Sequence, residues 1–134
     1  MWRSIRGDNT APVTELSPQE PARFNPDQLE DLCNKIGEIR AEAEVALALH
    51  RISAALPKLQ RLVETDVLAF ADTVDTLIVD ADMIGMATLA RVGRNVQDAF
   101  ASGNAVALAA TLARLERVGD RSVHAVWDLE DLSV

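Results

Sequence analysis

Carboxylates at helical spacing are the first candidates for chemistry in this sequence. Asp72, Asp75 and Asp82 stand at positions i, i+3 and i+10, which places them on one face of a helix. Paired carboxylates perform acid–base chemistry where a cleft shifts their pKa values apart. A run of charges at this spacing also fits a solvated acidic face, which is the more common outcome. Both interpretations of the three aspartates stay open at this level.

The two histidines are the only candidates for a base beside a nucleophile, and neither lies in a recognisable catalytic motif. His50 follows an apolar stripe in ALALHRISAAL, where a partly buried structural histidine is common. His124 comes late in the last apolar segment and is expected at the surface. The sequence has no glycine-rich phosphate loop, no zinc-type spacing and no Glu-x-x-His pair. We therefore expect no cofactor and no metal site.

Length and charge limit the function classes. A chain of 134 residues fits one domain with a real core. Its formal net charge of −8 argues against nucleic acid and against an anionic membrane surface as partners. The single cysteine fits a reducing compartment, and we see neither a signal peptide nor an apolar run of membrane-spanning length. A cytoplasmic location is the expectation.

Helix-capping and helix-breaking residues along the chain, together with apolar spacing, predict a series of helices. Residues 1–25 are rich in proline and polar residues and are interpreted as a flexible tail, with residues 26–134 forming one domain. Asn25 and Pro26 suit a helix start. Apolar residues then recur at helical spacing from Leu29 to Val63, and Pro57 predicts a kink or break near residues 54–56.

A third helical segment starts near Thr65, a candidate cap. Gly85 marks its junction with a fourth segment, and the Ser-Gly-Asn turn at 102–104 precedes a last segment over about 105–129. The third segment has an apolar stripe made of Val67, Phe70, Val74, Leu77, Ile78 and Ala81. Its opposite face carries Leu68, Asp72, Asp75, Val79 and Asp82. Short connections favour an all-α, antiparallel up-and-down four-helix bundle with an additional N-terminal helical segment.

The stretch DTLIVDADMIGM resembles histidine-containing phosphotransfer (HPt) domains. That family carries His-x-Leu-Lys-Gly, with the glycine of a later Ile/Leu-Gly-Ala motif ten positions after the histidine. Here Leu77 matches the motif leucine, Ile84 matches the Ile/Leu, and Gly85 stands ten positions after Asp75. The resemblance covers roughly residues 65 to 120, including a turn at Gly103 that matches the family's Gly-Asp turn.

The departures from the family motif change the expected function. Asp75 occupies the phosphohistidine position, Ile78 the lysine position and Val79 the glycine position. The resemblance thus implies a non-enzymatic HPt-like signalling module that docks a response-regulator receiver domain or a histidine kinase without carrying phosphate. The implied docking residues lie around the phosphoacceptor-equivalent position, Asp75. They are Leu68, Asp72, Val79 and Asp82.

Two alternatives belong to other classes. HRISAAL loosely resembles the histidine boxes of histidine-kinase dimerisation helices, so His50 is the alternative phosphoacceptor of an active phosphotransfer protein. An exposed imidazole is required for that chemistry. In the other alternative the bundle is an interaction or oligomerisation scaffold, and Asp75 is only a solvated charge.

Overall fold

The computed structural model describes the backbone of residues 25–132 and the side chains of residues 25–126, and this part of the chain is helical apart from short connections. The predicted tail lies outside the described residues except for Asn25. The all-α prediction is confirmed for the described part. The helices are α2 (Pro26–Ile36), α3 (Glu38–Ala55), the 3-10 turn η2 (Leu56–Lys58), α4 (Leu59–Thr65), α5 (Val67–Met83), α6 (Ala87–Ser102) and α7 (Ala105–Leu132).

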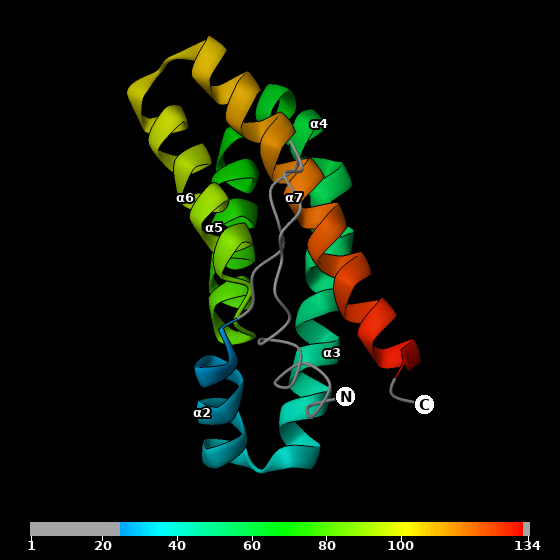
Figure 1. Cartoon of the computed structure of the whole chain (residues 1–134). Helices are drawn as coiled ribbons and strands as arrows, with labels where there is room; N and C mark the ends of the chain where they lie inside the picture. The colour runs from blue at the N-terminus through cyan, green and yellow to red at the C-terminus, as the bar shows by residue number, and fades with distance from the viewer. Residues whose placement is uncertain (1–24, 133–134) are drawn as a thin grey trace.

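The first helix begins where its capping residues predict. The Asn25 side chain accepts a hydrogen bond from the backbone N–H of Asp27, and Pro26 occupies the first turn. The apolar pattern continues across residues 36–38, however, and did not predict the break that the structure has there. Gly37 adopts φ 85° and ψ 158°, a conformation open to glycine, and this ends α2 before α3 starts. As a result α2 folds back along the lower end of α3 (Figure 1).

The break predicted at Pro57 is confirmed, since α3 ends at Ala55 and the chain continues through η2 into α4. The cap of α5 lies one residue later than predicted. Asp66, rather than Thr65, accepts a hydrogen bond from the backbone N–H of Ala69, at 3.1 Å. The turn at Gly103 is confirmed by its left-handed φ of 72°.

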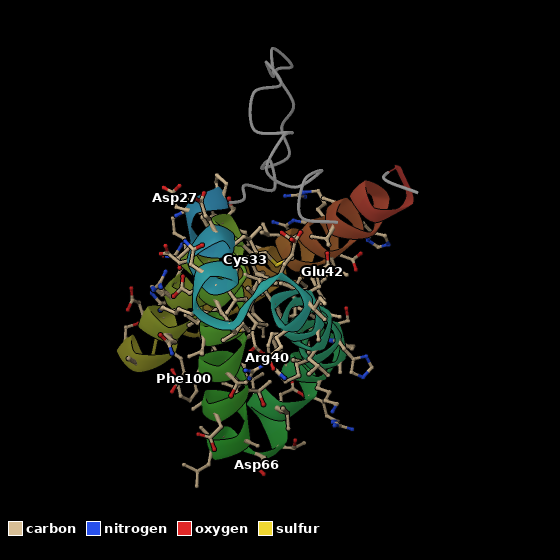
Figure 2. All side chains as sticks on the ribbon, turned by 90° about the horizontal axis from the view of Figure 1, so that it is seen from below. Asp27, Cys33, Arg40, Glu42, Asp66 and Phe100 are labelled. Atoms are coloured by element: carbon tan, nitrogen blue, oxygen red, sulfur yellow. The ribbon has the colours of Figure 1, made fainter. Side chains whose placement is uncertain are left out.

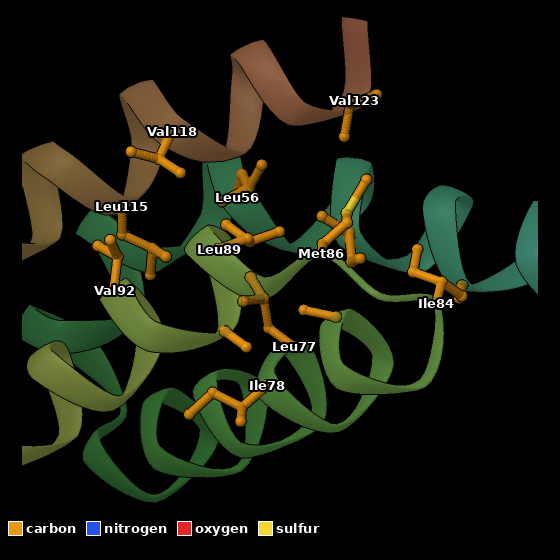
Figure 3. Close-up of a cluster of buried hydrophobic side chains, with 14 of the residues drawn as sticks. Leu56, Leu77, Ile78, Ile84, Met86, Leu89, Val92, Leu115, Val118 and Val123 are labelled. Carbon is orange, nitrogen blue, oxygen red and sulfur yellow. The ribbon is translucent and has the colours of Figure 1, made fainter. Parts of the chain in front are cut away.

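Successive helices pack on one another around a common core. α5 lies against α3 and α6, while α7 lies against α6 and also crosses α3 (Figure 1). Cys33 packs against this core from α2 (Figure 2). Part of the core is drawn in Figure 3, where α5, α6, α7 and η2 meet. The residues labelled there are Leu56, Leu77, Ile78, Ile84, Met86, Leu89, Val92, Leu115, Val118 and Val123.

Two glycines allow helices to approach closely. A Cβ atom on Gly93 would lie 2.7 Å from Ile78 Cγ1, and one on Gly119 would lie 2.6 Å from Leu56 Cδ1. Contacts this short are essentially never found for real Cβ atoms, so a larger residue would require the facing side chain or the helix that carries it to shift. Gly93 thereby brings α6 close to α5 beside the candidate site.

The junction between α5 and α6 also anchors the start of the described chain. The backbone N–H of Asn25 donates a hydrogen bond to the Gly85 carbonyl oxygen at 2.6 Å. Gly85 has φ 82°, and a Cβ atom there would lie 2.5 Å from the Asn25 carbonyl oxygen. The predicted junction at Gly85 is therefore confirmed, with a packing reason that the sequence did not reveal. Within residues 25–132, no helix is both long and apolar enough to cross a membrane.

Candidate functional site

Five residues form a continuous row along the outer side of α5, and we call them the α5 stripe. The residues of the α5 stripe are Leu68, Asp72, Asp75, Val79 and Asp82. The opposite side of α5 buries Phe70, Val74 and Leu77, so helical periodicity directs the stripe away from the core. Val67, expected in the apolar stripe, is instead 51% exposed because it begins the helix.

The stripe is more apolar than its three aspartates suggest. Leu68 is 80% exposed and Val79 is 65% exposed. Of the six large apolar side chains exposed in the described part of the chain, three lie on α5; the others are Ile39 and Leu47 on α3 and Val106 on α7. Leu68 and Val79 lie eleven positions apart along the stripe, with Asp72 and Asp75 between them, so the stripe combines separate apolar and acidic side chains.

Asp75 lies near the middle of α5 and is exposed. Its Oδ1 accepts a hydrogen bond of 2.6 Å from the Gln97 amide Nε2 on α6. This contact fixes the direction of the carboxylate and leaves the second oxygen toward solvent as an acceptor. No described arginine or lysine forms an ion pair with Asp75. Among the described side chains, Asp75 therefore has a hydrogen-bond donor but no oppositely charged partner.

Ile78 and Val79, three and four positions after Asp75, differ sharply in burial. Ile78 is only 7% exposed and packs against Gly93. Val79 is 65% exposed. Neither residue provides a cation beside Asp75.

Asp82 and Asp72 have different surroundings from Asp75. Asp82 forms an ion pair with Arg94 of α6, and both side chains are about half exposed. Such a pair largely cancels the charge of Asp82 while contributing little stability. Asp72 is exposed and lies at the rim of an open cleft between α3 and α5. The uncompensated charge of the stripe is thus concentrated at Asp72 and Asp75.

The sequence analysis did not identify the polar contact between Arg51 of α3 and Asp80 of α5. Asp80 is 5% exposed and accepts two hydrogen bonds from Arg51, at 2.9 Å from Nε and 2.8 Å from Nη2. The hydrogen bond and the attraction to Asp80 raise the pKa of Arg51, although burial opposes this. A raised arginine pKa means that the contribution of Arg51 to stability is fully present below arginine's ordinary pKa, while Asp80 is ionised, and is lost only as the pH rises through the raised value. One signal was available: Asp80 follows the buried Leu77 by three positions.

The cleft beside this pair has a volume of about 210 Å³. Its lining combines Arg51, Ala55, Asp72, Thr73, Thr76, Leu77 and Asp80. Asp72 therefore belongs both to this cleft and to the α5 stripe. A second depression, of about 440 Å³, lies between η2 and α7 and is lined by Ser53, Leu56, Pro57, Glu116, Arg117, Asp120 and Val123.

The histidines are not part of either cleft. His50 is exposed on α3, so the burial that would have ruled out its phosphorylation is not observed. His124 is exposed as predicted, and its Nδ1 lies 2.7 Å from the Asp120 carbonyl oxygen one turn earlier in α7. Among the described residues, no group of three His, Cys, Asp or Glu side chains is placed to hold a metal ion.

Comparison with known proteins gives no family for this chain. No family model, no curated protein and no solved structure matches it.

Proposed function

We propose that this chain is a non-enzymatic, HPt-like signalling module that docks a receiver domain or a histidine kinase through the α5 stripe. Its helices would correspond to the four-helix bundle of that family, with α3 and α4 together as the first, then α5, α6 and α7, and with α2 as the N-terminal addition. The observation that carries the proposal is the location of Asp75. It is an exposed carboxylate at the phosphohistidine position, held by Gln97 between two exposed apolar residues.

The surroundings of Asp75 favour docking without phosphate transfer. A carboxylate that accepts a phosphoryl group in receiver domains works with a bound Mg²⁺ and a lysine. Here the lysine position is the buried Ile78, and no described cation pairs with Asp75. Leu68 and Val79 would provide the apolar part of the contact, because exposed apolar side chains gain most from burial at an interface.

The docking test measures binding of the full chain to purified receiver domains of the organism that encodes it, by isothermal titration calorimetry. Val79→Lys should weaken binding by about tenfold or more, since a charge would replace a buried apolar contact. Val106→Lys is the matched control: the same substitution at a residue that is 81% exposed on α7, outside the stripe. Absence of binding to every receiver and kinase tested would refute the docking function.

A second candidate is phosphotransfer through His50, favoured by the exposure of that side chain. It predicts an acid-labile phosphoryl label after incubation with a phosphorylated receiver. The label should disappear in His50→Ala and persist in His124→Ala. A chain that takes up no label excludes this candidate and leaves the docking proposal intact.

A further inference from the structure

The middle of the α5 stripe is a mixed acidic and apolar surface without a described partner. Asp72 and Asp75 form no ion pair within the described side chains, in contrast to Asp82. Leu68 and Val79 lie on either side of them in the row and are 80% and 65% exposed. A partner that fits this surface presents apolar groups together with positive charges.

One segment of the chain itself has this chemistry. Residues 1–6, Met-Trp-Arg-Ser-Ile-Arg, hold three apolar and two basic side chains and no acidic one. Arg3 and Arg6 are three positions apart, as are Asp72 and Asp75. Residues 1–24 carry three arginines and three acidic residues, so the formal charge of −8 belongs to the remainder of the chain. Residues 1–6 are thus basic, whereas the chain beyond residue 24 is acidic.

The length of chain before the domain and its point of attachment allow the contact. The hydrogen bond between Asn25 and Gly85 fixes the start of the domain at the end of α5, three positions beyond Asp82. From Asp82 to Leu68 the stripe extends over about 21 Å. The chain between residues 6 and 25 can span up to about 63 Å. Tethering also gives the segment an effective concentration on the order of millimolar, so a weak contact suffices.

We propose that residues 1–6 of this chain bind its own α5 stripe. Trp2 and Ile5 cover the exposed apolar side chains, and the two arginines pair with Asp72 and Asp75. The contact itself does not require a signalling role. Its consequence, that the segment and an external partner compete for α5, rests on the proposed docking function.

Paramagnetic relaxation in the full chain tests the contact. A nitroxide is attached at Ser4→Cys in a Cys33→Ser background, and amide intensities are compared before and after the nitroxide is reduced. Amides of residues 72–79 should lose intensity severalfold, and the loss should be largest there and decrease across the helices packed against α5. The effect should vanish in about 1 M salt, where the Debye length is about 3 Å.

Charge variants separate a specific contact from general attraction. Arg3→Glu/Arg6→Glu and Asp72→Arg/Asp75→Arg should each abolish the broadening, and the combination should restore it. Reversal of two exposed acidic residues on α2, Glu30→Arg/Asp31→Arg, is the matched control and should leave it unchanged.

Three outcomes overturn the proposal. The first is equal broadening over all helices, and the second is broadening centred on another face. The third is broadening in isotope-labelled chains that carry no nitroxide when they are mixed with spin-labelled chains, which would identify a second copy of the chain as the occupant. Since no receiver is present, failure of the docking function leaves this result untouched. Loss of the broadening likewise leaves receiver docking to its own test.

Discussion

Removal of either member of the Arg51–Asp80 pair should destabilise the fold to different extents. The Asp80 side chain is 7% exposed, whereas that of Arg51 is 44% exposed. Arg51→Ala leaves a buried carboxylate without donors, and breaking a buried pair in this way costs about 3–5 kcal/mol. Because part of the pair faces solvent, we expect about 3 kcal/mol. Asp80→Ala leaves a guanidinium that water can reach, so its cost, after discounting for screening, is about 1–2 kcal/mol.

The double variant gives the sharper expectation. In Arg51→Ala/Asp80→Ala no charge is left buried, so the second substitution should recover about 1 kcal/mol or more of the stability lost in Arg51→Ala. Two neutral truncations of an ordinary surface pair would instead give costs that add.

Urea unfolding of the four proteins, followed by circular dichroism at constant pH and salt, measures these differences. The free energies are comparable if the dependence on urea is the same in all variants. The expected order of stability is wild type, then Asp80→Ala and the double variant together, then Arg51→Ala. If Asp80→Ala costs as much as Arg51→Ala, or the two costs simply add, the unpaired carboxylate is not the source of the instability and our reasoning is wrong.

Five further substitutions test two turns, the start of α5 and an exposed ion pair. Gly85→Ala should lower the free energy of unfolding by about 2 kcal/mol or more, because Gly85 has a positive φ and a Cβ atom there would clash with the Asn25 carbonyl oxygen. Gly103 also has a positive φ but open space around it, so Gly103→Ala should lower the free energy of unfolding by about 1 kcal/mol. Thermal unfolding of the two variants distinguishes them, and equal shifts would contradict the contact. Asp66→Ala removes the cap of α5 and should lower the free energy of unfolding by about 1 kcal/mol in the same urea assay. Thr65→Ala should lower it by less than about 0.5 kcal/mol. A larger loss for Thr65→Ala than for Asp66→Ala would show that Thr65 is the cap. Arg94→Ala should change stability by at most about 1 kcal/mol, since its ion pair is half exposed, and a larger loss would show that the pair is less solvated than we find.

The sequence determined the features that depend on neighbours along the chain. Helical periodicity predicted which side of α5 is buried, and the break at Pro57, the junction at Gly85 and the turn at Gly103 followed from backbone restrictions of single residues. The outward direction of the α5 stripe follows from the same periodicity. The helical break at Gly37 was missed because the apolar pattern continues across it, and an isolated glycine is tolerated within helices.

Only the tertiary structure decided which side chains meet across helices. Gln97 reaches Asp75 over 22 positions and Arg51 reaches Asp80 over 29, and both contacts depend on the separation and register of two packed helices. Gly93 contributes to that separation by allowing α6 to approach Ile78. Local spacing fixes a side chain's direction on its own helix, whereas its partner is fixed by how the helices pack. For this reason the sequence predicted an exposed Asp75 but not the amide that holds it.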